Sequence, residues 1–568
     1  MTEAVQKAGS QFALGLVDPV LAEIAKQGSI FEMGVIDGMR QFVRAPANLH
    51  QMIEGARRFG DQTCVVDFDG DRTERRLTFA QVFARRDQLA AHLRIAPGER
   101  VAICMRNRAE WLIGYLAVIA AGGVAVLLNS RAAGPELLAM LEDADPAIAL
   151  VDGPAAQALD AAGYSGRTLD LTAASDPDDA APASAATASG GAAARADDPC
   201  SILFTSGTTG RAKGAVLGHR NLITGLMSTQ LAGAMVLHNM ASQYGMTAEA
   251  LLAGMPQQAA LLVFPLFHVS GLGSGFLSPF LAGSKIVIMR RWDATVAVRL
   301  IAEEGVTMFS GVPTMLWDIV HRAKLVAGDL ANLRNIGCGG QALPVNLIDA
   351  IHAACPQAQI GTGYGMTECS GAIAQAVGPD FLRRPASAGR VLPLVDVRII
   401  AADGENQPAG GVGEIVVRGP QVMQGYWNRP EDTAAVLSPD GWLRTGDIGM
   451  VDADGYVFIV DRKKDMVISG GENIYCAEVE RVIGEIAGVH ECAAFGLPDD
   501  RLGERLVAVV VADGLHEAAI VDHVAERLAR YKAPHRVAIS RQTLPRNALG
   551  KADKIALRQA WNSLLGEQ

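Results

Sequence analysis

The stretch 111–128 contains no charged residue and is long enough to span a membrane as one helix. Gly122 and Gly123 divide it, so that a helical pattern over 109–121 is followed by a short apolar run over 124–128. A helix, a glycine turn and a buried strand together form the repeating unit of a parallel α/β core. The sequence therefore predicts a soluble α/β unit here rather than a transmembrane helix.

Helical and strand-like segments alternate along most of the chain. Short apolar runs at 101–105 and 147–151 predict further strands, and the alternation resumes over 200–390. Residues 172–199 consist mostly of small, polar and proline residues, which indicates a flexible linker or loop. From 395 to 460, strand-like runs are separated by Asp-Gly pairs, so we expect hairpins in a β-rich subdomain.

Both ends of the chain carry amphipathic helix patterns. Near the N-terminus, an apolar helix face is predicted from Val20, Leu21, Ile24 and Phe31. After about residue 465 a small domain follows, and one of its helices places on a single face Ile520, Val521, Val524 and Leu528.

The charge balance and the cysteines limit the classes of partner and compartment. The 568 residues include 50 Lys and Arg against 61 Asp and Glu, which argues against a nucleic-acid-binding surface. Eight scattered cysteines form no CxxC pair, as expected for buried thiols in a reducing cytoplasm. The segment 1–20 contains charged residues and no long apolar region, so no signal peptide is predicted. Peripheral contact with a membrane and a homodimer stay open.

A glycine-rich loop is the sharpest local motif. Thr205-Ser-Gly-Thr-Thr-Gly-Arg-Ala-Lys-Gly214 follows the apolar run 201–204, and its glycines, hydroxyls and lysine are suited to surround an anion. By composition alone, a plain mobile loop would explain it equally well. It is not a Walker loop, because no Gly-Lys-Ser/Thr occurs, and the glycines of 271–275 do not have dinucleotide-binding spacing.

This loop resembles the phosphate-binding signature of the adenylate-forming (AMP-binding) superfamily, which includes acyl- and aryl-CoA ligases. Further matches follow in the expected order between residues 48 and 568: Phe264-Pro-Leu-Phe-His268, Gly337-Cys-Gly-Gly-Gln341, Gly363-Tyr-Gly-Met-Thr-Glu368, Arg444-Thr-Gly-Asp447, Asp461-Arg-Lys-Lys-Asp465, Gly470-Gly-Glu-Asn473 and Pro545-Arg-Asn-Ala-Leu-Gly-Lys551.

The resemblance implies an α/β fold in two parts. A large N-terminal lobe would combine parallel sheets, helices and the β-rich subdomain, and a small α+β C-terminal domain would move against it. The implied divisions are an extension at 1–45, an AMP-binding domain at 46–463 containing the 172–199 linker, and a C-terminal domain at 464–568.

The same resemblance implies a binding site for ATP and Mg²⁺. The triphosphate would be held by Thr205, Ser206, Gly207, Thr208, Thr209, Gly210 and Lys213. The adenine slot and the ribose contacts would come from Gly339, Gly340, Gln341, Gly363, Tyr364, Gly365, Met366, Asp447 and Arg462. Thr367 would contact the α-phosphate, and Glu368 would bind Mg²⁺.

Catalysis and thiol transfer are assigned in the same way. Lys551 would bridge the substrate carboxylate and the α-phosphate in the transition state, and Lys464 would be the hinge on which the C-terminal domain rotates. His268 would act as a gate or positioning group beside the coenzyme A tunnel. The tunnel itself would be formed by Ser469, Gly470, Gly471 and Glu472. Lys554, close to Lys551, is expected to be solvated.

The acyl pocket is expected to be apolar or small, with no cation to pair a second carboxylate. Its candidate residues are Val269, Ser270, Phe309, Gly337 and Thr362. The implied activity is an ATP-dependent acid–CoA ligase for a medium- or long-chain fatty acid. Alternatives are an aryl-acid ligase, an acyl-AMP ligase that loads a carrier protein, and a non-catalytic binder. The methionine-rich segment 230–260 is either a flap near the acyl entrance or gap-filling core.

Overall fold

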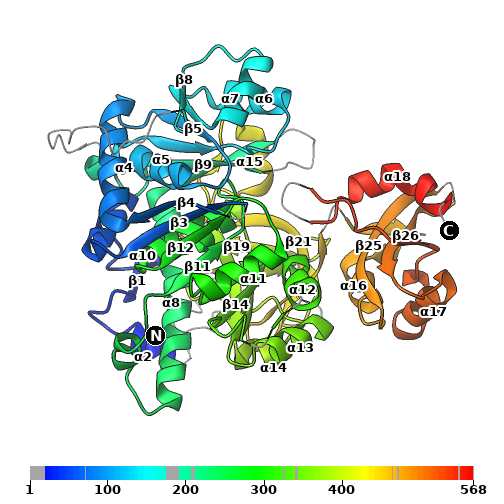
Figure 1. The fold of residues 1–568 in the computed structure, drawn as a ribbon. Helices are drawn as coiled ribbons and strands as arrows, with labels where there is room; N and C mark the ends of the chain where they lie inside the picture. Colours follow the sequence, from blue (N-terminus) through cyan, green and yellow to red (C-terminus); the bar gives the residue numbers. More distant parts are fainter. Residues whose placement is uncertain are drawn as a thin grey trace.

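The chain folds into a large N-terminal lobe with a smaller C-terminal unit at its side (Figure 1). The computed structural model describes residues 19–70, 72–173, 191–205, 212–323, 325–326, 328–339, 343, 345–462, 465–469, 472–499, 501–547 and 551–566. The predicted α/β class and the division into a large and a small part are confirmed. The boundaries at 45 and 463 stay predictions.

The uncharged stretch 111–128 forms a helix beside a seven-stranded sheet and one strand within it. The strands of this sheet in spatial order are β20 (Gly425–Tyr426), β10 (Lys213–Gly218), β9 (Pro199–Thr205), β6 (Val124–Leu127), β5 (Arg100–Cys104), β7 (Ile148–Val151) and β8 (Thr168–Asp170). Helix α5 (Ala109–Ala120) leads into β6 through Gly122, whose φ of 79° favours glycine. The predicted helix, turn and strand are confirmed, and no helix of the described residues is long and apolar enough to cross a membrane.

A second, nine-stranded sheet packs beside the first (Figure 1). In spatial order it contains β17 (Arg390–Val391), β16 (Gly371–Val377), β15 (Gln359–Met366), β14 (Asn335–Gly339), β13 (Met308–Gly311), β11 (Ala259–Leu262), β12 (Lys285–Met289), β3 (Thr63–Asp69) and β4 (Arg72–Thr78). Strands β3 and β11 to β15 are parallel, so that the carboxyl ends of β13, β14 and β15 meet at one edge.

The two faces of this sheet pack against different helices. Apolar residues of one face join a core with helices α11 (Ala294–Glu303), α12 (Pro313–Arg322) and α13 (Val345–Ala354). The other face joins the main core of the lobe, which includes α8 (His219–Gln243) and the π-helical turn η5 (Gly271–Leu277). Further helices of the lobe are α3 (Leu49–Glu54), α4 (Phe79–Leu93), α6 (Gly134–Ala144), α7 (Gly153–Ala161), α10 (Ser278–Leu281), α14 (Pro379–Arg383) and α15 (Pro430–Val436).

The β-rich subdomain is a four-stranded antiparallel sheet. Its strands are β18 (Asp396–Ile400), β19 (Gly413–Arg418), β21 (Leu443–Val451) and β22 (Val457–Arg462). Gly404 and Gly455 turn with φ of 91° and 82°, which confirms the hairpin turns expected from the Asp-Gly pairs.

The C-terminal unit has its own sheet and two apolar cores. The strand order is β24 (Glu472–Ile474), β23 (Val467–Ser469), β26 (Gly503–Ala512) and β25 (Val489–Asp499), and β27 (Arg536–Ser540) pairs in parallel with β26. Its helices are α16 (Cys476–Ile483), α17 (Glu517–Arg527) and α18 (Lys554–Gly566). Ile520 and Val524 of α17 are fully buried, as the helix pattern predicted.

Three parts of the N-terminal lobe differ from expectation or extend it. Helix α2 (Pro19–Ile24) buries Leu21, but Phe31 lies beyond the helix and packs on Phe42 of the hairpin β1 (Met33–Ile36) and β2 (Met39–Phe42). Phe31 is therefore not part of the predicted helix face, because the helix ends at Ile24, about two turns before Phe31.

The segment 230–260 continues α8 to Gln243 and then forms the short helix α9 (Ala248–Ala253). Of its methionines, Met235 packs against the core and Met246 is exposed. The end of the predicted linker is packed as well, since a side chain at Gly191 would meet the Ile119 carbonyl oxygen at 2.3 Å. The rest of that linker, 174–190, lies outside the described residues.

Candidate active site

A tyrosine and an aspartate from two different sheets meet at the edge where β15 ends. Tyr364, on β15, donates its hydroxyl hydrogen bond to Asp447 Oδ2 at 2.7 Å. Asp447 is buried on β21, and its own amide donates to Thr445 Oγ1 at 3.1 Å. Asp447 also stands opposite Arg462 in the β21–β22 register. Three residues assigned to adenine and ribose from separate motifs are thus brought together.

The protonation of Tyr364 follows from this contact. Burial first, and then the Asp447 carboxylate, raise the pKa of the Tyr364 phenol well above its ordinary value. The phenol therefore stays protonated at neutral pH and keeps donating to Asp447. The carboxylate is held in one orientation as a result, and an oriented carboxylate is suited to accept hydrogen bonds from a pair of hydroxyls.

Glu368 has a partner that sequence reasoning missed. The Tyr426 hydroxyl donates to Glu368 Oε1 at 2.8 Å, and the Met423 amide donates to the Glu368 carbonyl oxygen at 2.8 Å. Burial and the Glu368 carboxylate raise the pKa of Tyr426, so its phenol remains a donor. The signal in the sequence was the Gly-Tyr-Trp run at 425–427, placed just before the proline that starts α15.

The position of Glu368 fits a magnesium ion that bridges phosphates. Mg²⁺ prefers oxygen ligands and commonly takes only one or two carboxylates, with water and phosphate oxygens completing its coordination. Glu368 supplies a buried carboxylate that Tyr426 holds in place at one oxygen. In the described residues no cluster of three His, Cys, Asp or Glu side chains forms a metal site of the all-protein type. The donor set therefore fits a cation that arrives with its nucleotide.

Lys213 lies beside Tyr426 at the start of β10. Its ammonium is 2.5 Å from Asp432 Oδ1 on α15 and 5.5 Å from the centre of the Tyr426 ring. Thr205, at the end of β9, donates its hydroxyl to the Lys213 carbonyl oxygen at 3.3 Å and so closes the base of the glycine-rich loop. Asp432 is a second residue that sequence reasoning missed. Ser206, Gly207, Thr208, Thr209 and Gly210, together with Gly340 and Gln341, lie outside the described residues.

His268 is held in one tautomer by its own turn. Its Nδ1 lies 2.8 Å from Ser270 Oγ and accepts the Ser270 amide hydrogen at 3.4 Å. Since an amide N–H can only donate, Nδ1 is the acceptor and the proton of the neutral ring lies on Nε2. Ser270 was predicted as an acyl-pocket residue, and the structure places its hydroxyl on the histidine.

Lys551 of the C-terminal unit acts electrostatically on His268. Burial, and next to it the Lys551 ammonium, lower the pKa of His268 from 6.5 to about 4. A lysine of one domain therefore lies close enough to act on a histidine of the other. The loop that carries it is closed at its base, because the Asn547 amide donates to the Lys551 carbonyl at 2.9 Å and the Lys551 amide to Asn547 Oδ1 at 3.1 Å.

The candidate acyl residues divide between the two faces of the nine-stranded sheet. Phe309 is 1% exposed and stacks on Trp292 at 5.9 Å, in the core beneath α11 and α12. Gly337 is on the opposite face, where a side chain would meet Ser310 Oγ at 2.5 Å. Thr362 is in register with Cys338, which belongs to the Phe309 core. Strand alternation therefore keeps Phe309 and Thr362 away from Gly337.

On the Gly337 face, the residue beside Gly337 is Ser310, and not Phe309 or Thr362. It is partly buried, and its hydroxyl occupies the space beside Gly337. Val269, next to His268, is 6% exposed and belongs to the main core. Because β13 alternates, Ser310 and Phe309 face opposite sides of the sheet, and the assignment of Phe309 to the acyl pocket stays a prediction.

The predicted coenzyme A segment lies in the C-terminal sheet. Ser469 is the last residue of β23 and stands opposite Glu472 of β24 and Gly503 of β26. Gly470, Gly471 and the hinge Lys464 lie outside the described residues. A ring contact of 5.5 Å between Trp317 on α12 and His490 on β25 joins the two domains at another point.

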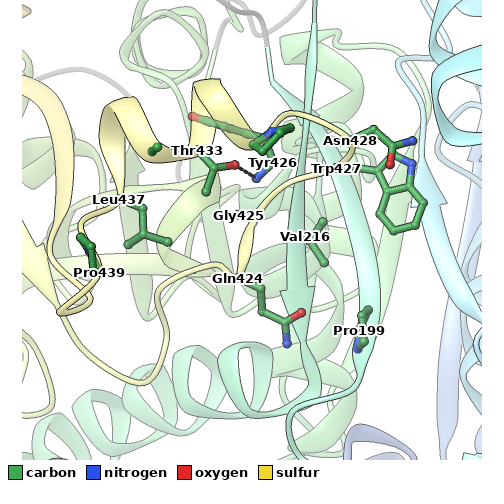
Figure 2. A pocket seen from close by; sticks show the side chains of 12 residues that line it. Pro199, Val216, Gln424, Gly425, Tyr426, Trp427, Asn428, Thr433, Leu437 and Pro439 are labelled. Carbon is green, nitrogen blue, oxygen red and sulfur yellow. Dashed lines mark hydrogen bonds between the residues drawn. The ribbon is translucent and has the colours of Figure 1, made fainter.

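A pocket behind Tyr426 is separate from these residues. Figure 2 shows it between β10, β20 and α15, with Trp427 on one side and Leu437 on the other. Its volume is about 580 Å³, and it contains none of the side chains predicted for the site. Thr433 Oγ1 accepts the Tyr426 amide hydrogen at 2.9 Å there, so the wall of this pocket fixes the backbone that presents Tyr426 to Glu368.

Comparisons with known proteins agree with this geometry. A family model described as AMP-binding enzyme matches residues 53–427, and one described as AMP-binding enzyme C-terminal domain matches 478–551. A long-chain-fatty-acid–CoA ligase, FadD13 of Mycobacterium tuberculosis, is 36% identical over 86% of this chain and 94% of the relative. A feruloyl-CoA synthase of an Amycolatopsis species is 37% identical over 85% of this chain and 94% of the relative.

Solved structures give the same result. A Mycobacterium tuberculosis fatty acyl CoA synthetase has a TM-score of 0.65 at 32% identity and covers 91% of this chain and 99% of its own. ATP-bound MatB from Rhodopseudomonas palustris has a TM-score of 0.73 at 29% identity, with coverage of 90% and 99%. The chain belongs to the AMP-binding enzyme family and is an AMP-forming acid–CoA ligase that uses ATP, Mg²⁺ and coenzyme A.

Proposed function

We propose that this ligase activates a monocarboxylic acid with an apolar tail, a medium- or long-chain fatty acid, and transfers it to coenzyme A. The observation that carries the proposal is that the Lys551 ammonium lies near enough to His268 to lower its pKa, and the candidate lining residues for the acid are Val269, Ser310 and Gly337. None of those three lining residues carries a charge that would pair a second carboxylate. The similarity to a long-chain-fatty-acid–CoA ligase supports the same substrate class.

The first half-reaction joins the acid to the α-phosphorus of ATP. A carboxylate oxygen of the acid attacks that phosphorus, the bond to the β-phosphate oxygen breaks, and pyrophosphate leaves. Lys551 carries a positive charge to the point where the carboxylate and the α-phosphate converge, which lowers the barrier by stabilising the transition state. Thr367 would hold an α-phosphate oxygen, and Lys213 and Thr205 the outer phosphates. Magnesium bound through Glu368 would neutralise phosphate charge.

The nucleoside would be held by the residues that meet at the end of β15. Asp447, fixed by Tyr364, would accept hydrogen bonds from the ribose hydroxyls, and Arg462 stands opposite it in the register of β21 and β22. A Cβ at Gly339 would meet nothing within 4 Å and one at Gly363 only the Ala374 carbonyl oxygen at 3.6 Å, so these two glycines leave room for the adenine, whereas the Gly371 backbone fills the space beside Gly365. Glycine has no Cβ, so the adenine ring can lie against the backbone at Gly339 and Gly363 without a clash.

His268 would act as a neutral donor. Its pKa of about 4 keeps the imidazole uncharged at neutral pH, and Ser270 leaves the proton on Nε2. A neutral Nε2–H can donate to a carboxylate or carbonyl oxygen of the acid without adding a second positive charge beside Lys551. His268 is therefore a positioning group and not a general base in this proposal.

The second half-reaction would follow a rotation of the C-terminal unit at Lys464. The coenzyme A sulfur attacks the carbonyl carbon of the acyl-adenylate, and AMP leaves. The rotation would withdraw Lys551 and bring the 469–472 segment to the acyl group, since both belong to the same small domain. Lys464→Pro should then keep adenylate formation and lose thioester formation, and an equal loss of both would contradict a hinge at this position.

A panel of acids tests the substrate. Acetate, hexanoate, decanoate, palmitate, benzoate and ferulate are each assayed for AMP formation with ATP, Mg²⁺ and coenzyme A. We expect decanoate or palmitate to give the highest kcat/KM. A maximum at ferulate or benzoate would favour the aryl-acid alternative, which the similarity to a feruloyl-CoA synthase supports. AMP and acyl-adenylate without coenzyme A ester would favour a carrier-protein ligase.

Location and association form a separate part of the proposal. All eight cysteines are free thiols and seven are buried, which supports a reducing compartment such as the cytoplasm. Peripheral membrane contact and a homodimer are further predictions. Co-sedimentation with vesicles of anionic phospholipid tests the first, and light scattering of the purified chain tests the second.

A further inference from the structure

Lys554 is not the solvated lysine that the sequence predicted. It begins α18, three residues after Lys551, and its side chain is 19% exposed. Its ammonium lies 2.8 Å from Glu480 Oε1 on α16, whose side chain is 23% exposed. The expectation was wrong because a lysine is buried only where another part of the fold supplies its partner, which no local pattern reveals.

Three groups around Lys554 favour its charged form. Burial lowers its pKa, but Glu480, Cys476 and Asp465 act in the opposite direction and leave the pKa of Lys554 above its ordinary value. Lys554 is therefore charged throughout the physiological range. Glu480 and Cys476 belong to α16, whereas Asp465 follows directly after the proposed hinge at Lys464.

Glu480 is itself held rigidly. Its Oε1 accepts the Ala494 amide hydrogen from β25 at 2.8 Å, and its carbonyl oxygen accepts the Cys492 thiol at 3.3 Å. The Cys476 thiol donates to the Asp465 carbonyl at 3.1 Å, which ties the start of α16 to the segment after the hinge. Lys554 is thus anchored to a helix fixed from both sides, on the sheet and at the hinge segment.

The anchor is also the base of the catalytic loop. On the incoming side, Leu544 is buried and Arg546 pairs with Glu491 at 2.8 Å. On the outgoing side, the chain passes from Lys551 through Asp553, whose amide donates to the Pro545 carbonyl at 2.8 Å, to Lys554. Between these two ends lies Lys551, whose ammonium is near enough to the N-terminal lobe to act on His268. Lys554 is therefore fixed three residues after Lys551, at the outgoing end of the same loop.

We propose that the Lys554–Glu480 ion pair is a positioning device that sets the placement of Lys551 for acyl-adenylate formation. The inference rests on the role proposed above for Lys551. The pair touches no substrate, so it acts only through the loop. It should matter in the half-reaction that needs Lys551 in the site, and much less in thiol transfer, for which the domain has rotated away.

The same helix provides a matched control. Lys532 lies 2.6 Å from Glu478 Oε2, also on α16, with side chains 17% and 27% exposed. Its burial and geometry are close to those of the Lys554 pair, but Lys532 is on the turn η7 (Arg530–Lys532), away from the loop of Lys551. A loss of general domain stability would affect both variants alike, whereas a loss of loop placement would affect only one.

The test compares both half-reactions in Lys554→Met, Lys554→Arg, Lys532→Met and Lys551→Met full-length enzymes. Adenylate formation is measured as single-turnover pyrophosphate release without coenzyme A, using the acid that wild type turns over fastest in the panel. Transfer is measured as thioester formation from the synthetic adenylate of that acid. We expect Lys554→Met to slow adenylate formation on the order of 10- to 100-fold, because a small displacement of a catalytic group greatly lowers the rate. The rate of transfer should change by no more than about twofold.

The other variants decide between explanations. Lys554→Arg should recover most of the rate, and Lys532→Met should leave both steps near wild type. Equal slowing of both steps by Lys554→Met, or no slowing of either, would overturn the positioning role. If Lys551→Met itself leaves adenylate formation intact, the proposed role of Lys551 fails instead. Should Lys554→Met not fold, Glu480→Gln, which still accepts the Ala494 amide hydrogen, must give the same selective loss.

Discussion

Replacing Lys551 by methionine should raise the pKa of His268. Methionine keeps the length of the side chain and removes its charge, so the variant isolates the electrostatic contact between the two domains. In the structure burial and the Lys551 ammonium lower the pKa of His268 from 6.5 to about 4. That difference corresponds to about 3 kcal/mol of preference for the neutral ring.

The size of the expected change follows from the order of the two causes. Burial is the larger and remains in the variant, whereas the Lys551 contribution is lost. The pKa of His268 should therefore rise by less than half of the difference and stay below its ordinary value. A rise all the way to 6.5 would mean that the ring is not buried.

Nuclear magnetic resonance of histidine-labelled protein measures this directly. The His268 signal is assigned by its loss in His268→Asn and is titrated in wild type and in Lys551→Met. The neutral tautomer can be read from the same spectra, with the proton expected on Nε2. A wild-type His268 that titrates near 6.5, or a pKa that does not change in Lys551→Met, would refute the placement of Lys551 beside this ring.

Three further outcomes follow from the same geometry. Tyr426→Phe removes a charge-assisted hydrogen bond worth about 1.5–3 kcal/mol. Adenylate formation in that variant should fall by at least about tenfold with a higher Mg²⁺ requirement, and unchanged kinetics would remove Tyr426 from the site. Gly337→Val should shift the preferred substrate of the panel toward shorter acids, because even a Cβ at this position meets Ser310 Oγ at 2.5 Å. An unaltered chain-length preference would place the acid elsewhere. The unfolded chain binds a proton on His268 more tightly than the folded chain does, so wild type should lose stability as pH falls from 6.5 toward about 4. Denaturant titrations should show a smaller loss of stability in His268→Asn over the same pH range.

Several elements of the fold could be predicted from local pattern alone. The division of the uncharged stretch 111–128 by Gly122 gave a helix and a buried strand, and both are present. The Asp-Gly pairs gave the hairpins at Gly404 and Gly455. These succeed because a turn with positive φ and a helix with an apolar face depend on neighbours in sequence.

The site was predictable only in part. The motifs correctly suggested that Tyr364, Asp447 and Arg462 would gather, although nothing in their spacing gave the hydrogen bond between Tyr364 and Asp447. The separation of Phe309 from Gly337 could not be predicted, because both faces of the sheet are covered and the sequence of a short buried strand does not reveal which parity points to which core. Tyr426 was missed because its partner Glu368 comes from a distant strand end.

Buried charge was the least predictable feature. Lys554 looks like any polar residue at the start of a C-terminal helix, and its burial depends on Glu480 in α16. A pair of this kind exists only once the C-terminal sheet has assembled, so neither periodicity nor composition carries its signature.

The central claim is that this chain makes an acyl-adenylate with Lys551 and then transfers the acyl group to coenzyme A. Rapid-quench measurement of both half-reactions in wild type and Lys551→Ala tests it most directly. We expect the rate of adenylate formation from ATP and acid to fall on the order of 100-fold or more in Lys551→Ala, because the substitution removes a transition-state contact. The same variant should convert supplied acyl-adenylate to the thioester at a rate near that of wild type. Adenylate formation at the wild-type rate in Lys551→Ala would contradict the account.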